Sequence, residues 1–157
     1  MQLNLKNSIA FFDLEATGTN VSTDRIVEIS IVKLNPDGGQ QIYTRRVNPG
    51  VPIPLEASLI HGLYDKDLKN EPHFKDLAQE VFQFIGLSDL AGFNVLKYDI
   101  PLLVEEFLRS GIDFDLDKRN LLDAQKIFHL MEKRNLSAAY KFYCGKKLEN
   151  AHSAEAD

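Results

Sequence analysis

Two carboxylates at the end of an apolar segment constrain this chain more than any other feature. The run from Ile9 to Gly18 reads IAFFDLEATG, so Asp13 and Glu15 close a stretch typical of a β-strand buried on both faces. Residues two apart on a strand project on the same side. Paired acids in an apolar strand are costly unless a cation neutralises them. The pattern therefore indicates either a strand-end surface feature or an oxygen-rich site suited to Mg²⁺ or Mn²⁺.

Further side chains of this kind occur later in the chain. Asp99 follows GFNVLKY and precedes the apolar run IPLL, and His152 and Asp157 stand in the final segment HSAEAD. The segments DLEATG, NVLKYD and HSAEAD resemble, in the same order, the three motifs of the DEDDh 3′–5′ exonucleases. By this pattern the chain is similar to the proofreading (epsilon) subunits of bacterial DNA polymerase III and to related stand-alone exonucleases.

The resemblance implies a site with two divalent ions, Mg²⁺ or Mn²⁺, held by four carboxylates. Asp13 would contact both ions, Glu15 would bind the ion that activates water, and Asp99 would hold the second ion, with Asp157 as the fourth ligand. His152 would take the proton of the attacking water, because the ordinary pKa of histidine, ~6.5, lies close to working pH. The alternatives are helix-dipole stabilisation for Asp99 and a plain surface position for His152.

The same resemblance suggests contacts to the terminal nucleotide. Thr17 and Gly18 follow the first motif, where family members hold that nucleotide. Leu14 and Phe93 are candidates to flank the 3′ base, with packing in the core as their alternative role. His61, in the run LIHGL, is a candidate substrate contact or a loop cap.

The hydrophobic periodicity predicts an α/β protein with a mixed five-stranded sheet flanked by helices, which agrees with the ribonuclease H-like fold of the family. The turn composition of residues 35–39 predicts a hairpin between the second and third strands. We expect strands at 8–14, 25–33, 41–47, 89–93 and 120–122, and helices at 56–61, 74–85, 101–108, 123–132 and 136–143.

Length and composition limit the remaining possibilities. The 157 residues predict one exonuclease domain over 1–157, with a C-terminal helix cut short at 157 relative to the family. No apolar stretch approaches the ~20 residues that cross a bilayer, and no signal peptide is recognisable. The single cysteine, Cys144, fits a reducing compartment, so we expect a cytoplasmic protein without membrane attachment.

The net charge of −5 argues against a protein that coats duplex DNA, since such binders normally carry a basic stripe. It fits an enzyme that grips a few terminal nucleotides, because bound divalent ions invert the field of the acidic site. The leading hypothesis is a metal-dependent 3′–5′ exonuclease that releases nucleoside 5′-monophosphates from the 3′ ends of DNA, single-stranded DNA being the expected substrate and a polymerase complex a candidate partner. Two alternatives stay open: an exoribonuclease acting on short RNA, and a binding module of a polymerase complex with little activity.

Overall fold

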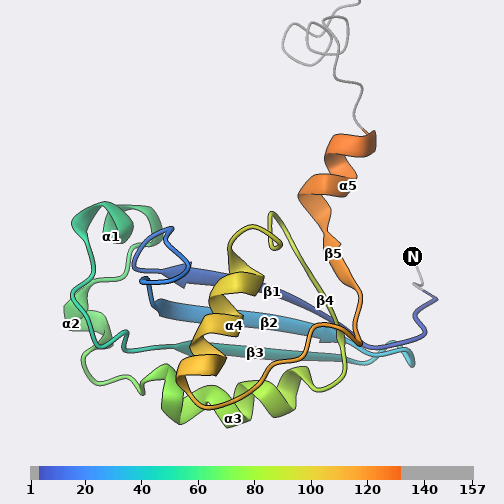
Figure 1. Ribbon diagram of the computed structural model, residues 1–157, viewed down its shortest axis with the longest axis horizontal. Coiled ribbons are helices and arrows are strands. Elements are labelled where there is room, and N and C mark those ends of the chain that lie inside the picture. Colours follow the sequence, from blue (N-terminus) through green and yellow to red (C-terminus); the bar gives the residue numbers. More distant parts are fainter. Residues whose placement is uncertain (1–3, 132–157) are drawn as a thin grey trace, which may run out of the picture. The chain divides into compact units, whose positions relative to one another are not determined.

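The computed structural model describes residues 4–131 of the chain (Figure 1), in a unit that ends at Asp123 and a second that begins at Ala124. The first unit contains β1 (Ile9–Ala16), β2 (Ile26–Leu34), β3 (Gln40–Arg46), α1 (Leu55–His61), α2 (Asp65–Leu68), α3 (Phe74–Ile85), β4 (Asp89–Gly92), α4 (Asp99–Arg109) and β5 (Leu121–Asp123). The second unit contributes α5 (Ala124–Met131). The helix predicted at 136–143 lies outside the described residues, and the single domain over 1–157 stays a prediction.

The strands form the mixed five-stranded sheet that the sequence predicts, in the order β3-β2-β1-β4-β5. β1, β2 and β3 are antiparallel neighbours, whereas β4 runs parallel to both β1 and β5. The parallel pairing of β1 with β4 ends at Phe11 opposite Ala91. At Gly92 the strands are so close that a Cβ atom would lie 2.8 Å from the carbonyl oxygen of Phe12. β1 thus continues past the end of β4, and its free end carries the acidic pair.

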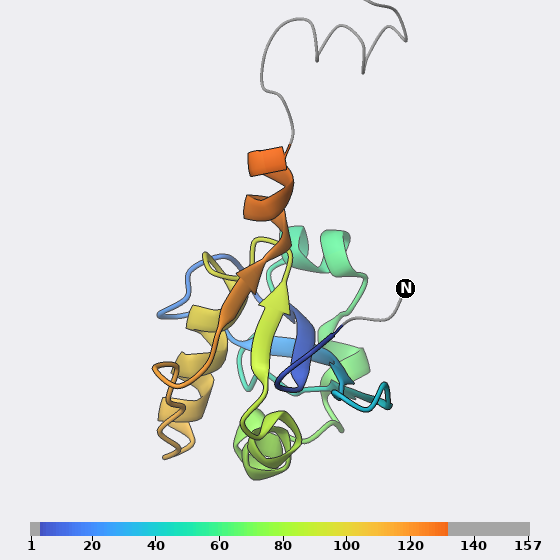
Figure 2. The same cartoon turned by 90° about the vertical axis from the view of Figure 1, so that its right-hand side faces the viewer.

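Two helices cover one face of this sheet. In Figure 1, α4 crosses β1 and β2, and Figure 2 shows α3 nearly end-on beside it. Phe107 of α4 stacks on Phe114 with 4.7 Å between ring centroids and meets Phe74 of α3 edge-on at 5.5 Å. The predicted periodicity of α3 is confirmed, because its apolar stripe is buried: Phe74, Leu77, Ala78, Val81 and Ile85.

The structure corrects three expectations. β1 is not buried on both faces, since Phe11 is 39% exposed, whereas its neighbour Phe12 points to the opposite face and is buried in the core. α4 begins at Asp99, two residues before the predicted start, because Pro101 is tolerated within a first turn. α2 was not predicted, because a single helical turn is too short to give a periodic signal. Within residues 4–131, no helix has the length and apolar character needed to cross a membrane.

Candidate active site

The free end of β1 forms one side of a cavity of about 630 Å³. Asp13 and Glu15 lie on the same face of this strand, opposite Ser30 and Glu28 of β2 in the register. The remainder of the lining comes from the segment that follows β1, from α1 and from the start of α4. The lining residues are Asp13, Leu14, Glu15, Ala16, Thr17, Gly18, Thr19, Asn20, Val21, Asp24, Pro54, Glu56, Ala57, Ile60, His61, Tyr98, Asp99 and Leu102.

Asp99 reaches this cavity from the first turn of α4. Its Oδ1 atom accepts a hydrogen bond of 3.0 Å from the backbone N–H of Leu14, which lies between Asp13 and Glu15. This N–H is free to bond a side chain because Leu14 lies beyond the last β1–β4 pair. The contact brings a third carboxylate beside the acidic pair, as the sequence predicts.

Two of the three carboxylates, Glu15 and Asp99, are harder to ionise than usual. Burial raises the pKa of Asp99 to about 6, and the charges of Asp13 and Glu15 add to the rise while the Leu14 hydrogen bond counteracts it. Burial also raises the pKa of Glu15, again with a contribution from Asp13, and the nearby His61 lowers it. Both shifts mean that the folded cluster disfavours negative charge when no cation is present.

His61 closes α1 and faces the same cavity. Its Nδ1 atom accepts a 3.1 Å hydrogen bond from the backbone N–H of Leu63, so the expected role as a loop cap is confirmed. With Nδ1 acting as acceptor, the neutral ring carries its proton on Nε2. Nε2 is buried, and it has no hydrogen-bond partner within the described part of the chain. A buried donor of this kind favours a ligand atom, because an unmade hydrogen bond is costly.

The segment from Thr17 to Arg25, here called the wall loop, forms the side of the cavity that follows β1. Asp24 closes the loop internally, since its carboxylate accepts a 2.8 Å hydrogen bond from the Thr17 hydroxyl and a 2.7 Å hydrogen bond from the Asn20 N–H. A Cβ atom at Gly18 would lie 2.6 Å from Oδ2 of Asp24, so a larger residue there would displace the carboxylate that closes the loop. The loop is therefore a defined surface and not a loose connection.

Most of the residues proposed from sequence meet at this cavity. Those that line it are Asp13, Leu14, Glu15, Thr17, Gly18, His61 and Asp99. Phe93 is not among the lining residues, and its 64% exposure also contradicts the alternative core role. His152 and Asp157 lie outside the described residues, so their roles stay predictions.

Sequence reasoning missed other members of the lining. Glu56, in the first turn of α1, adds a further carboxylate, and Tyr98 precedes Asp99 at the start of α4. Glu56 has the pattern of an acid that stabilises a helix N-terminus, so nothing in the sequence singled it out. Tyr98 directly precedes Asp99 in the second motif, and this position was the only feature of the sequence that pointed to it.

The donor set fits a hard divalent cation, although the described residues alone do not complete a metal site. Asp13, Glu15 and Asp99 offer only oxygen atoms, which Mg²⁺ and Mn²⁺ prefer. Burial, with a contribution from neighbouring carboxylates, raises the pKa values of Glu15 and Asp99, so a cation in the cavity would stabilise their ionised forms. Within residues 4–131, however, no three acidic, histidine or cysteine side chains are arranged closely enough to enclose an ion.

Comparison with known proteins places this geometry in a family context. Residues 10–157 match the model of the RNase T family, which is described as exonuclease. The chain is 30% identical over 162 residues to DNA polymerase III subunit epsilon of Buchnera aphidicola subsp. Schizaphis graminum, covering 96% of this chain and 67% of that protein. It is 26% identical over 157 residues to the 3′-5′ exonuclease DinG of Staphylococcus haemolyticus, of which it spans only 17%.

Solved structures of exonuclease I have the same fold. One superposes with a TM-score of 0.72 at 16% identity, covering 97% of this chain and 38% of that chain. E. coli exonuclease I in complex with a 5cy-dA13 oligonucleotide gives a TM-score of 0.71 at 15% identity, covering 80% of this chain and 30% of that chain. At this identity the likeness shows the fold alone, and it agrees with the ribonuclease H-like sheet predicted from sequence.

Proposed function

Since the chain belongs to the RNase T exonuclease family and is a 3′–5′ exonuclease family member, we propose that it removes nucleoside 5′-monophosphates from the 3′ end of single-stranded DNA. The reaction is hydrolysis of the terminal phosphodiester, with water as the nucleophile and the 3′-oxygen of the next nucleotide as the leaving group. Mg²⁺ or Mn²⁺ is the proposed cofactor.

The observation that carries this proposal is the charge of the cavity. Its described lining contains several carboxylates and no lysine or arginine. A nucleic-acid backbone is also negatively charged, and it would be repelled by such a cavity unless cations stood between the two. An acidic cavity in an exonuclease family member therefore supports metal-dependent phosphodiester hydrolysis.

Asp13, Glu15 and Asp99 are the described residues that would hold the ions, with Asp157 as the further ligand expected from sequence. Divalent ions bound there supply a lowered pKa for the attacking water and charge stabilisation for the departing oxygen. His152 is the proposed acceptor of the water proton.

The other residues of the cavity hold and orient the terminal nucleotide in this proposal. Thr17 and Gly18 present the wall loop to it, and Nε2 of His61 offers a hydrogen bond to a phosphate or sugar oxygen. Leu14 and Ile60 supply apolar surface near the carboxylates. Correct orientation of the scissile bond accounts for a large share of the rate enhancement in such enzymes.

Single-stranded DNA is the proposed substrate, and a polymerase complex with a proofreading role is the proposed setting. Support for the substrate comes from exonuclease I, whose structure contains a DNA oligonucleotide, and support for the setting comes from the epsilon subunit. The chain spans two thirds of that subunit but less than a fifth of the DinG relative. Strand preference and partner are accordingly proposed from likeness and not from contacts in this molecule.

The test is degradation of a 5′-labelled and of a 3′-labelled 20-mer by the full chain. We expect progressive shortening of the 5′-labelled strand and immediate release of labelled mononucleotide from the 3′-labelled strand, with Mg²⁺ or Mn²⁺ and not with EDTA. Asp13→Asn should abolish the reaction. Asp37→Asn, which changes a carboxylate in the turn after β2, is the matched control and should retain it.

Each outcome of this assay decides a separate point. Faster shortening of an RNA 20-mer of the same sequence would replace DNA by RNA as substrate. Activity that persists in EDTA or in Asp13→Asn would contradict the metal site. A folded wild-type chain that shortens neither strand would contradict the enzymatic function and favour a binding module.

A further inference from the structure

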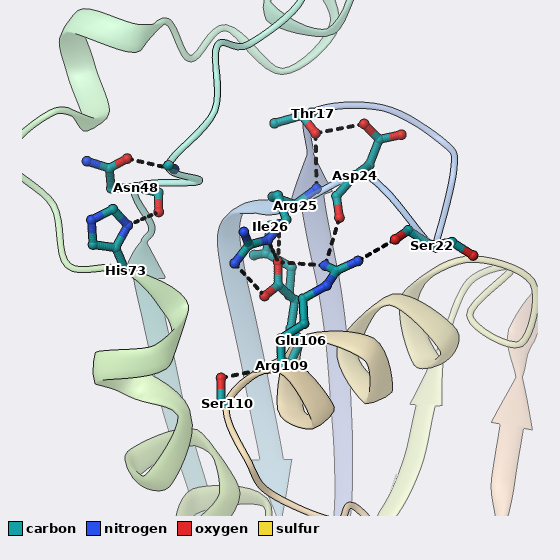
Figure 3. A network of polar contacts seen from close by, with 11 residues as sticks. Thr17, Ser22, Asp24, Arg25, Ile26, Asn48, His73, Glu106, Arg109 and Ser110 are labelled. Carbon is teal, nitrogen blue, oxygen red and sulfur yellow. Dashed lines mark hydrogen bonds and ion pairs between the residues drawn. The ribbon is translucent and has the colours of Figure 1, made fainter.

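Arg109, the last residue of α4, fastens the wall loop to that helix (Figure 3). Its guanidinium donates hydrogen bonds to two backbone carbonyl oxygens, that of Ser22 at 2.6 Å and that of Asp24 at 3.2 Å. The same guanidinium lies 3.5 Å from Oε1 of Glu106, one turn earlier in the helix. One side chain thus spans the gap between a helix and a loop that are more than 80 residues apart in sequence.

Glu106 provides a fixed base for this contact. Its side chain is only 1% exposed, and it pairs with Arg25 through hydrogen bonds of 2.7 and 3.1 Å. The backbone N–H of Ile26 donates a further hydrogen bond of 3.2 Å to the same carboxylate. A buried carboxylate with this many donors has one defined geometry, so Arg109 is held beside it in a defined position.

The anchored segment is the side of the proposed active site. Thr17, Gly18, Asn20 and Asp24 all line the cavity, and Asp24 joins the two ends of the loop through Thr17. Arg109 binds the loop from outside the cavity, because it is not among the lining residues. Arg109 ends the helix that begins at Asp99. One helix therefore positions a carboxylate of the site with its first residue and the wall loop with its last.

We propose that Arg109 is a positioning residue for the nucleic-acid substrate, which acts by clamping the two carbonyls of Ser22 and Asp24 and so holding the wall loop in its binding shape. The proposal rests on the proposed function of the cavity. A loop that is already ordered binds its ligand without the entropic cost of ordering on contact. Loss of the clamp therefore weakens substrate binding while leaving the reacting groups in place.

The experiment compares Arg109→Ala, Arg109→Lys and Arg119→Ala in the full chain. Arg119 is the matched control, because it also donates to backbone carbonyls, those of Gly86, Ser88 and Asp115, but lies outside the cavity lining. For each variant we would measure kcat and KM for a single-stranded oligonucleotide, the Tm, and hydrogen exchange of the Asn20, Thr23 and Asp24 amides. Each of those amides donates a hydrogen bond to another residue of the loop.

For Arg109→Ala we expect faster exchange of the three amides and a rise in KM on the order of tenfold with kcat nearly unchanged, the change that corresponds to ordering about one residue on binding. Arg109→Lys keeps the charge beside Glu106 but has one terminal nitrogen in place of the two that bond the Asp24 and Ser22 carbonyls. We expect the Tm of Arg109→Lys to be close to that of the wild type, whereas its KM stays as high as that of Arg109→Ala. Arg119→Ala should lower Tm and leave KM and the loop amides unchanged.

A merely structural role gives a different pattern. If Arg109 only stabilised the fold, Arg109→Ala and Arg119→Ala would both reduce the active fraction, and KM would not change in either. Wild-type exchange of the loop amides in Arg109→Ala, or a wild-type KM in Arg109→Lys, would overturn the proposal. Failure of the proposed function is distinguishable, because it would be seen as an inactive wild-type chain.

Discussion

The backbone N–H of Leu14 donates a hydrogen bond to Oδ1 of Asp99 across 85 positions of sequence. The donor lies between Asp13 and Glu15 on β1, and the acceptor begins α4. This one contact brings the second acidic motif to the first and keeps a helix terminus against the free end of a strand. It also brings three carboxylates close together, and burial with the charges of the two neighbours raises the pKa of Asp99 to about 6.

Asp99→Asn should change how stability depends on pH. The pKa of Asp99 is raised in the folded state above its unfolded value of ~3.9. Between the two values the folded chain binds a proton at Asp99 that the unfolded chain has released, so the free energy of unfolding falls as pH rises from about 4 to about 6. In EDTA we expect the wild-type Tm to fall relative to Asp99→Asn over this interval, so that the variant is the more stable at pH 7.5. Thermal melts at pH 4.5, 6 and 7.5 measure the difference. A difference in Tm between wild type and Asp99→Asn that is the same at all three pH values would contradict the raised pKa of Asp99.

Mg²⁺ should reverse this order of stability. A ligand that binds only the folded state at 100 times its Kd stabilises by ~2.7 kcal/mol. We expect a gain of this order for the wild type and a much smaller gain for Asp99→Asn, which has lost a carboxylate from the proposed site. NaCl at equal ionic strength is the control, because simple screening would raise both melting temperatures alike. Equal gains in Mg²⁺ and NaCl would exclude specific metal binding.

His61 offers two separable functions on its two ring nitrogens. His61→Asn places an oxygen where Nδ1 accepts from Leu63, and His61→Gln places a donor near the position of Nε2. We expect His61→Asn to keep the wild-type Tm and to lose about tenfold in kcat/KM, as for one hydrogen bond to a charged group. His61→Gln should show the opposite combination, and steady-state kinetics with thermal melts distinguish them. His73→Ala is the control, since Nδ1 of His73 bonds Asn48 O and His73 is not among the residues that line the cavity.

Removal of the Glu106 carboxylate should be strongly destabilising. Glu106→Leu leaves Arg25 without its bidentate partner, and because the Arg25 side chain is 29% exposed we expect a cost near the lower end of the ~3–5 kcal/mol for breaking one side of a buried ion pair. The double variant Arg25→Met/Glu106→Leu should lose less than Glu106→Leu alone, because Arg25 no longer leaves an unpaired charge and Arg109 keeps its hydrogen bonds to the Ser22 and Asp24 carbonyls. Urea unfolding gives both values. A loss below 1 kcal/mol in Glu106→Leu would mean that water replaces the carboxylate.

Local patterns account for most of the elements that the sequence predicted. The apolar positions of α3 recur at helical spacing, and the buried residues of the helix are all among them: Phe74, Leu77, Ala78, Val81 and Ile85. The strands β1 to β3 follow from apolar runs and from the turn at residues 35–39, which places β2 and β3 as antiparallel neighbours. Such signals depend on a few neighbouring residues, so they can be recognised without knowing what packs against them. The single turn of α2 and the start of α4 lacked such a signal.

The sequence by itself determined the chemistry available to this protein: which strand carries paired carboxylates, which later acid belongs with them, and which sheet the chain builds. Only the tertiary structure decided that Asp99 bonds to Leu14, that Glu56 and Tyr98 join the cavity, and that Arg109 holds the wall loop. The physical reason is the separation along the sequence over which each kind of interaction acts. Periodicity and turn chemistry act over a few residues, whereas a hydrogen bond or a buried ion pair between distant segments exists only once packing has brought its two partners together.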